Sequence, residues 1–367
     1  MSANPQLPEY AGADAKAALL AAGASGTIYS LVMPESEAAL AAVVEGEELF
    51  SRYHEPWTQK QDAMHEAYFD AWIGWSSPVV RFTPGEFPFR YPTAGASEGI
   101  FKLMAEYAAD ARERGREPTI HVFEGEYEGF PAYAEALRMR CVRHDRTQWR
   151  DMAGRIDPDG ALWISQPSAI DGRVWSDFPG LVEMLARERP DVAVMPDLTY
   201  VGSVAEPFIV PLDSPNIPAF VFSHSKPFGG YYHRVGGVFA RAERPSLFGN
   251  KWFKNLLSLA WGTEMMRRHG VFDLPAKYRP VQEQAAGRVA AALGIDRLEP
   301  ADVSIMATAQ AGAATSDLLR SLLRGSPGEQ VVRLCLTPAM TCLIDPGMAP
   351  ATAPRLQVQW QAAEATP

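Results

Sequence analysis

The chain has 367 residues, of which 47% are hydrophobic and 21% are charged, and its formal net charge at pH 7 is −10. This length suits two domains, and the composition is that of a soluble globular protein with no leader sequence and no apolar stretch long enough to span a membrane. The acidic balance argues against a nucleic-acid-binding surface, and three cysteines without paired spacing argue against a disulfide framework or a metal site, so we expect reduced thiols in a cytoplasmic protein.

The beginning of the chain is predicted to be largely helical. Alanine-rich stretches predict helices over residues 14–22 and 35–48, and an amphipathic helix rich in aromatic residues is expected over 53–75. A rhythm of strand, loop and helix begins near residue 91, and it indicates a parallel α/β sheet.

Five further strands and three helices are expected from this rhythm. The strands are predicted over 119–123, 161–166, 192–195, 219–223 and 236–241, and the helices over 98–114, 131–138 and 178–188. After residue 245 the pattern changes, and helices over 253–268 and 281–293 with a strand over 331–336 predict a smaller α+β portion.

The most informative segment is residues 223–236, which read Ser-His-Ser-Lys-Pro-Phe-Gly-Gly-Tyr-Tyr-His-Arg-Val-Gly. It follows a predicted strand and resembles the cofactor-lysine motif of fold type I pyridoxal-phosphate enzymes, specifically of the aminotransferase class I/II family. In that family the lysine forms a Schiff base with the cofactor aldehyde, and a serine before it and an arginine after it hold the phosphate. Ser223, Lys226 and Arg234 match these three positions.

A glycine-rich turn before the helix predicted at 98–114 is a second candidate for binding phosphate. Free backbone N–H groups and the positive end of a helix dipole suit an anion there, although an ordinary helix cap would have the same pattern. The family uses this turn as its first phosphate cradle, so the resemblance implies roles for Gly95, Ala96 and Ser97.

Two loops that follow predicted strands supply further family positions. The resemblance implies that Tyr127 stacks on the cofactor ring, with Phe130 as the alternative. It implies that Asp197 pairs with the ring nitrogen and that Tyr200, three residues later, donates a hydrogen bond to the phenolic oxygen of the ring.

Two more residues complete the set that the resemblance implies. Arg333, on the strand predicted at 331–336, matches the arginine that grips the substrate α-carboxylate through its planar fork. Tyr53 lies where family members send a tyrosine from the partner subunit to the phosphate.

One position departs from the family pattern. Family members usually carry an asparagine that donates a hydrogen bond to the phenolic oxygen, and the matching residue here is Ala169. Ser168 or Gln166 could substitute, or Tyr200 could act alone. This departure affects electron demand at the reacting centre and leaves the type of reaction open.

The resemblance implies an α/β fold with an aspartate-aminotransferase-like large domain, built on a mostly parallel seven-stranded sheet, plus a small α+β domain. We expect residues 1–50 to form an N-terminal arm and part of the small domain, 51–245 the large domain that binds pyridoxal 5'-phosphate, and 246–367 an interdomain helix with the rest of the small domain. A homodimer with a shared active site is implied as well.

The implied activity begins with an external aldimine of a free L-amino acid, from which Lys226 removes the α-proton. An aminotransferase is the leading hypothesis, and a lyase or cyclase that eliminates or cyclises at the β or γ carbon is the alternative. A cofactor-binding regulator would need a preceding DNA-binding domain, and a sugar aminotransferase would not need Arg333.

Overall fold

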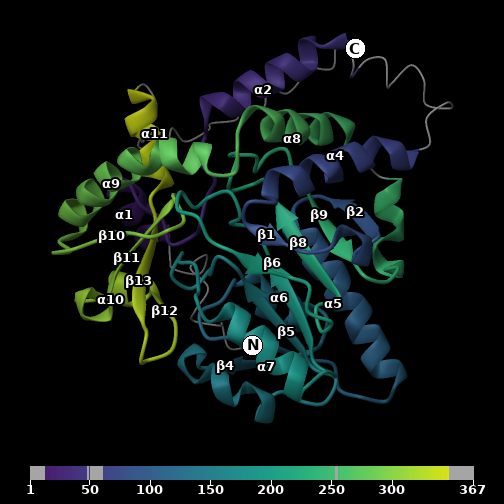
Figure 1. Cartoon of the computed structure of the whole chain (residues 1–367). Coiled ribbons are helices and arrows are strands. Elements are labelled where there is room, and N and C mark those ends of the chain that lie inside the picture. The colour runs from purple at the N-terminus through teal and green to yellow at the C-terminus, as the bar shows by residue number, and fades with distance from the viewer. Residues whose placement is uncertain (1–12, 48, 50–60, 253–254, 347–367) are drawn as a thin grey trace, which may run out of the picture.

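The computed structural model of the protein describes residues 13–47, 49, 61–252 and 255–346. Two main sheets lie beside each other, a seven-stranded sheet formed by the middle of the chain and a four-stranded sheet formed by its later part (Figure 1). This arrangement confirms the predicted mixed α/β class with a large and a small sheet.

The seven-stranded sheet has the strand order β2-β9-β8-β6-β5-β3-β4. Only β9 runs antiparallel to its neighbours β2 and β8, and every other neighbouring pair is parallel. The strands are β2 (Phe89–Thr93), β3 (Thr119–Phe123), β4 (Arg140–His144), β5 (Ala161–Ser165), β6 (Ala193–Asp197), β8 (Ala219–Ser223) and β9 (Gly236–Ala240).

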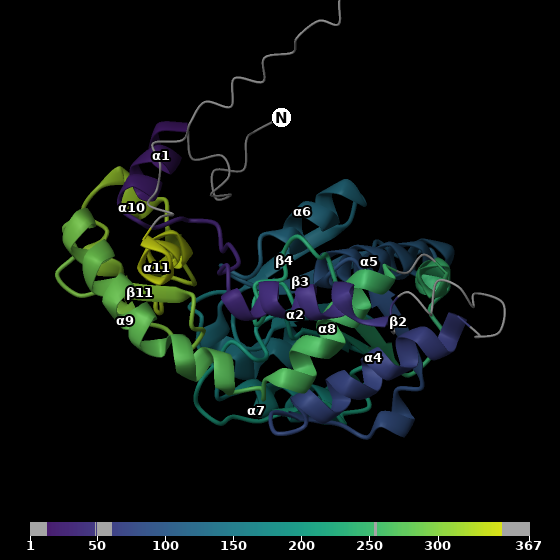
Figure 2. The same cartoon turned by 90° about the horizontal axis from the view of Figure 1, so that it is seen from above.

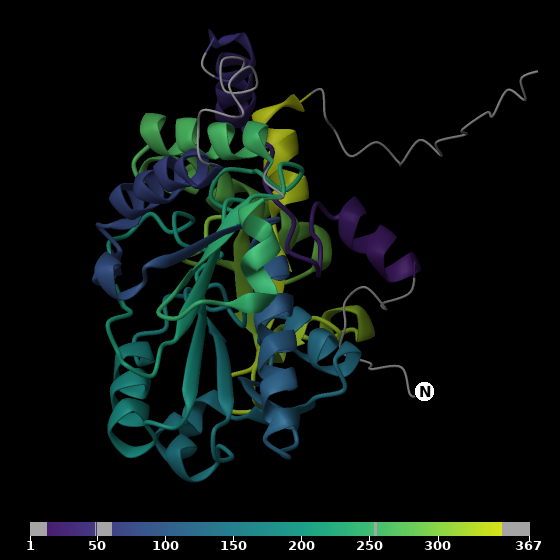
Figure 3. The same ribbon diagram turned by 90° about the vertical axis from the view of Figure 1, so that its right-hand side faces the viewer.

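Helices cover both faces of this sheet (Figure 3), so its central strands are apolar on both sides. In β8, Ala219 and Val221 join a core with α5 (Ala96–Glu113) and α6 (Gly129–Ala136). Phe220 and Phe222 point the other way, where α4 (Gln61–Ser76) and α7 (Phe178–Glu188) contribute to the core and Trp72 stacks 4.4 Å from Phe222. The alternation gives the strand one fixed register, because a slip by one residue would exchange the two faces.

The four-stranded sheet is antiparallel and has the order β10-β11-β13-β12. Its strands are β10 (Glu299–Pro300), β11 (Met306–Gln310), β12 (Leu323–Arg324) and β13 (Val331–Cys335). Around it, as seen from above in Figure 2, lie α1 (Ala13–Ala21), α9 (Asp273–Leu293), α10 (Asp317–Arg320) and α11 (Thr337–Ile344). Ser25 forms a bridge with Cys335, so an early segment joins the sheet made by the late one.

The remaining elements connect these parts. Helix α8 (Leu256–Arg268) packs against both α2 (Pro34–Glu45) and α4. A short parallel pair joins β1 (Val80–Arg81) to β7 (Val210–Pro211). Among the described residues, 3-10 helices lie at Pro84–Glu86, Arg146–Gly154, Pro245–Lys251 and Ala311–Ala313. Within the described ranges, no helix is both long and apolar enough to cross a membrane.

Most predicted elements are confirmed, and the differences have physical causes. Helix α9 begins at Asp273 and not at residue 281, because it continues through Pro280 even though proline lacks the N–H that a helix needs. Strand β4 was not expected because its arginines interrupt the apolar pattern at the edge of the sheet. The helix predicted over 53–75 begins at Gln61 within the described residues, and residues 53–60 lie outside them.

Candidate active site

The predicted site residues gather where the parallel strands end. Strands β2, β3, β6 and β8 all release their loops at the carboxyl edge of the seven-stranded sheet, which is where open α/β sheets bind ligands. Only Arg333 comes from the other sheet, and Tyr53 lies outside the described residues.

Lys226 lies three residues beyond β8 and is half-buried. Its Nζ donates a hydrogen bond to the backbone oxygen of Ile28, and no acidic side chain of the described residues forms an ion pair with it. Burial lowers the pKa of Lys226 to about 8, and the positive charges of Arg234 and Arg333 act in the same direction. A large share of this amine is therefore neutral near pH 8, in the form that serves as a nucleophile or base.

The segment between α1 and α2 passes over this lysine and contacts both the loop after β8 and strand β13. Besides the Ile28 contact, the Ser30 hydroxyl donates to the backbone oxygen of Ser225, and the Tyr29 N–H donates to Sγ of Cys335 at 3.3 Å. The sequence predicted only a connection between helices here, because contacts made by the backbone leave no pattern in the side chains.

The residues predicted to hold a phosphate lie side by side. Gly236 on β9 packs so closely that a Cβ there would lie 3.1 Å from both the Gly95 and Ser223 α-carbons. At Gly95, where φ is +83°, a Cβ would lie 3.1 Å from Nη2 of Arg234, which also donates to the Ala94 oxygen at 2.7 Å. Ala96 and Ser97 open α5 directly beside this point, so a guanidinium, a hydroxyl and a helix N-terminus are close together.

Asp197 is a buried carboxylate without a counter-charge. It ends β6 with 4% of its surface exposed, and its Oδ1 accepts hydrogen bonds from the Thr199 N–H at 3.0 Å and the Thr199 hydroxyl at 2.5 Å. Burial raises the pKa of Asp197 to about 6, although both hydrogen bonds oppose this. No cationic side chain of residues 61–252 or of the other described ranges pairs with it, so the site suits a ligand that brings a positive charge.

Tyr127 and Tyr200 lie close enough to Asp197 for its negative charge to act on their hydroxyl groups. The Tyr127 hydroxyl lies 3.2 Å from the Ser97 hydroxyl, so this side chain reaches from the β3 loop to the start of α5. Tyr200 is 7% exposed, and burial raises the pKa of both phenols. Phe130, the alternative to Tyr127, is fully buried and packs 5.8 Å from Trp163 in the core.

Arg333 projects from β13 and is 2% exposed. Its Nη1 donates to the backbone oxygen of Ala169, and its Nη2 donates to Oε1 of Glu128 at 3.0 Å. Arg324 donates to the same Oε1 at 3.0 Å. Sequence reasoning missed Glu128 and Arg324, because nothing in the sequence signals that residues about two hundred positions apart share one contact.

The structure also limits what can replace the family asparagine at Ala169. The Ser168 hydroxyl accepts a hydrogen bond from Nη1 of Arg146 at 3.0 Å. The Gln166 amide bonds both backbone groups of Trp175, at 3.1 and 3.2 Å. The Gln166 amide is therefore engaged elsewhere, whereas the Ser168 hydroxyl only accepts and keeps its own proton to donate, so Ser168 and Tyr200 remain the candidate donors.

A buried glutamate anchors the loop that carries Tyr127. Glu126 accepts three hydrogen bonds, from the Ser165 N–H at 3.1 Å, the Ser165 hydroxyl at 2.6 Å and the Tyr127 N–H at 3.0 Å. The Ser165 hydroxyl in turn accepts from the Ala169 N–H at 2.7 Å. Burial raises the pKa of Glu126 to about 7, although the hydrogen bonds from Ser165 and Tyr127 oppose this.

We expect Glu126→Gln to destabilise the protein. Both carboxylate oxygens accept from donors, so the amide nitrogen of glutamine would face a donor and leave hydrogen bonds unmade, which costs about 1–3 kcal/mol. Urea unfolding measures this change. Glu124→Gln, two residues away on the wall of the neighbouring cavity, is the control. An equal loss of unfolding free energy in both variants would contradict the role of Glu126 in holding this loop.

In the part of the chain that the structure describes, no group of three or more His, Cys, Asp or Glu side chains could hold a metal ion. No model of a protein family matches the sequence, and neither does any curated protein.

Solved structures with the same architecture include enzymes of two reaction types. An aminotransferase from Mycobacterium tuberculosis is 17% identical, with a TM-score of 0.60 over 85% of this chain and 88% of that one. YbdL from Escherichia coli, with a methionine aminotransferase function, is 15% identical, with a TM-score of 0.61 over 86% and 95%. The pyridoxal-phosphate-bound C-S lyase from Staphylococcus hominis is 13% identical, with a TM-score of 0.61 over 88% and 91%. The chain therefore has the aminotransferase fold that these enzymes share.

Proposed function

We propose that this chain is a pyridoxal-5'-phosphate-dependent enzyme that acts on a free L-amino acid as an aminotransferase. The observation that carries the proposal is the position of the Lys226 amine and the buried, unpaired Asp197 carboxylate, which lie at the ends of the neighbouring parallel strands β8 and β6, on the sheet edge that also holds the anion cradle. The fold shared with aminotransferases supports it.

The residues present fit this cofactor. Its phosphate would lie against Ser223, Arg234 and the turn of Gly95, Ala96 and Ser97, which lie together because Gly95 and Gly236 have no side chains to hold them apart. Its ring nitrogen, when protonated, would supply the positive charge that Asp197 lacks. Tyr127 lies between these two points, with its hydroxyl 3.2 Å from the Ser97 hydroxyl and a charge interaction with Asp197, and Tyr200 also lies near Asp197.

When bound, the cofactor supplies an aldehyde that links to amines and an electron-withdrawing ring that acidifies the substrate α-carbon. Lys226 would bond the aldehyde, and its neutral amine would accept the α-proton. Asp197 would keep a proton on the ring nitrogen, Tyr200 would donate to the phenolic oxygen, and Arg333 would receive the substrate α-carboxylate.

A β/γ-eliminating lyase or a cyclase is the second candidate. Alanine at 169 has no side-chain donor and the Gln166 amide is bonded elsewhere, so the phenolic oxygen lacks the amide donor that the family pattern provides. The fold shared with a C-S lyase is consistent with this branch.

We also propose a homodimer in which Tyr53 of the partner reaches the phosphate, with a large domain of residues 51–245 and a small domain from both chain ends. Exposed aromatic side chains near the cradle support the dimer. Tyr231 packs 5.2 Å from the Arg234 guanidinium. The exposed fractions are Phe101 39%, Tyr231 48%, Tyr232 90%, Phe248 41% and Trp252 57%. The three free cysteines fit a cytoplasmic enzyme.

We expect light scattering to give twice the chain mass of 40.2 kDa. Replacing Tyr232 and Trp252 with glutamate should weaken the dimer at least about tenfold and weaken cofactor binding with it. Ile209→Glu, an exposed aliphatic position with 47% exposure, is the control. A dimer that survives the double substitution would contradict this interface.

The function is tested by the absorption spectrum of the purified protein with pyridoxal phosphate, alone and with a panel of L-amino acids. Conversion to the amine form of the cofactor, with release of a keto acid, establishes transamination. Product release with the cofactor unchanged establishes elimination or cyclisation. A protein that takes up no cofactor would refute the proposal.

A further inference from the structure

Glu128 is shared by two buried arginines. Nη2 of Arg333 and Nη2 of Arg324 both donate to its Oε1 at 3.0 Å, and the arginine side chains are only 2% and 6% exposed. Burial works to raise the pKa of Glu128, but the two guanidinium groups outweigh it and hold that pKa below its ordinary value. Glu128 is therefore ionised and bound to Arg333, the residue proposed to grip the substrate.

The charges in this cluster do not balance. Two guanidinium groups face one carboxylate, and Nε of each arginine is buried without a hydrogen-bond partner within the described ranges. An unpaired buried charge is strongly unfavourable. The cluster is thus one carboxylate short, and a substrate with one carboxylate would balance it.

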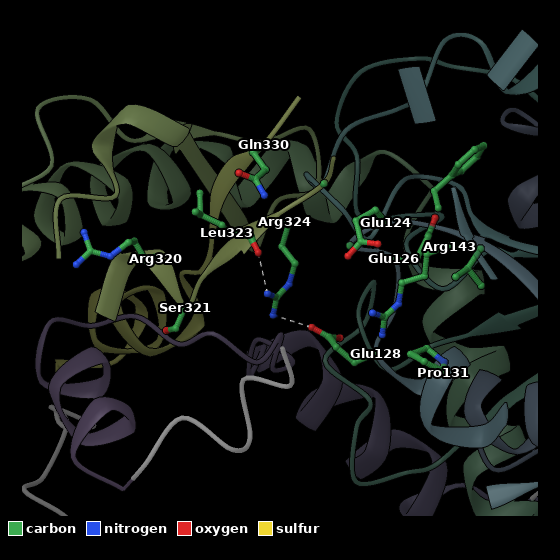
Figure 4. Close-up of a pocket in the computed structure, with 14 residues that line it drawn as sticks. Glu124, Glu126, Glu128, Pro131, Arg143, Arg320, Ser321, Leu323, Arg324 and Gln330 are labelled. Atoms are coloured by element: carbon green, nitrogen blue, oxygen red, sulfur yellow. Dashed lines mark hydrogen bonds and ion pairs between the residues drawn. The ribbon is translucent and has the colours of Figure 1, made fainter. Parts of the chain in front are cut away.

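Arg324 is held in place independently of Arg333. Its Nη1 donates to the Leu323 oxygen at 3.1 Å, while its Nη2 reaches Glu128. The side chains of Arg324 and Glu128 line a cavity of about 220 Å³ between the β3 loop and the four-stranded sheet. They point toward each other across this cavity (Figure 4). Glu128 therefore has room to turn away from Arg333 while it stays paired with Arg324.

We propose that Glu128 holds Arg333 while the substrate site is empty and is retained by Arg324 when the α-carboxylate of an amino acid takes its place on Arg333. This inference rests on the proposed function and names its substrate class. After the exchange each arginine has one carboxylate, so the site favours amino acids with a single carboxylate over dicarboxylic ones.

The test compares Glu128→Gln, Arg324→Gln and the double variant, each saturated with pyridoxal phosphate. Calorimetry measures the affinity for propionate, a carboxylate without an amine, and steady-state kinetics gives KM and kcat for the amino acid that the enzyme converts. Arg320→Gln is the control, because Arg320 lines the same cavity but is exposed and pairs with Asp317.

Glu128→Gln should bind propionate about tenfold more tightly and lower KM, because a neutral amide competes weakly for Arg333. Arg324→Gln should bind it about tenfold more weakly, because Glu128 then has only Arg333 as a partner. The double variant should bind propionate about as tightly as Glu128→Gln, because Arg324 acts through Glu128, and kcat should change little in all three.

A fixed structural cluster would give a different result. Both single variants would then lose propionate affinity and thermal stability together, the double variant would be worse than either, and the proposal would be overturned. Propionate binding does not require turnover, so a protein that converts no amino acid would refute the proposed function while the calorimetry still decides the role of Glu128.

Discussion

Replacing Lys226 with alanine should lower turnover by a factor of at least about 1,000, because no other described amine is buried in this site. The visible absorption band that the cofactor shows when linked to a lysine should disappear as well. The fold should survive, since the lysine has no ion pair and one hydrogen bond, to a backbone oxygen. Absorption spectroscopy and single-turnover kinetics measure both effects.

Lys226→Arg is the matched control for this experiment. It keeps a positive charge at the same position, but a guanidinium stays protonated and cannot serve as a nucleophile or base. Loss of activity in both variants shows that a neutral amine is needed and not merely a charge. If the alanine variant kept both the band and the turnover, another residue would have to carry the chemistry.

Asp197→Asn is expected to have opposite effects on the empty and the loaded protein. With cofactor bound, the charge pair at the ring nitrogen is lost, and breaking a buried pair costs about 3–5 kcal/mol, or roughly 100- to 10,000-fold in turnover. Without cofactor, the variant should be more stable at pH 8, because the wild type then holds an unpaired buried charge. Both Thr199 donors bind Oδ1, which asparagine retains.

The stability of the cofactor-free wild type should fall relative to Asp197→Asn as the pH rises, because folding raises the pKa of Asp197. Since burial raises the pKa of Asp197 from 3.8 to about 6, its contribution to stability is fully present below 3.8 and is lost as the pH rises through 6. The full difference is about 3 kcal/mol at pH 8, taken from roughly 1.4 kcal/mol for each unit of pKa. Urea unfolding of the two cofactor-free proteins from pH 4 to 8 measures it, and a gap that does not widen as the pH rises would contradict an unpaired Asp197.

Local sequence predicts much of the large sheet and little of the contacts between distant segments. Strands β3 and β8 and helix α7 have the expected bounds, because buried parallel strands are apolar runs and the helix has a clear apolar face. The short strands β10 and β12 have two residues each, too few to show any periodicity. They form because β10 pairs with the edge of β11 and β12 pairs with the edge of β13.

The same division applies to the candidate site. Residues near the cradle could be predicted because each lies in a short motif directly after a strand or before a helix. Glu126, Glu128 and Arg324 could not, since their roles depend on partners 39, 205 and 196 positions away. An acidic residue in a loop is otherwise most often a solvated one.

The segment between α1 and α2 has a consequence for how the protein is made. Tyr29 is synthesised 306 residues before Cys335, its partner on β13, and the same segment covers Lys226. On the ribosome, residues 223–236 emerge well before β13, the strand to which the covering segment is bonded. The lysine therefore stays open to solvent until β13 has been made, because a chain that stops earlier lacks the strand to which the covering segment is bonded.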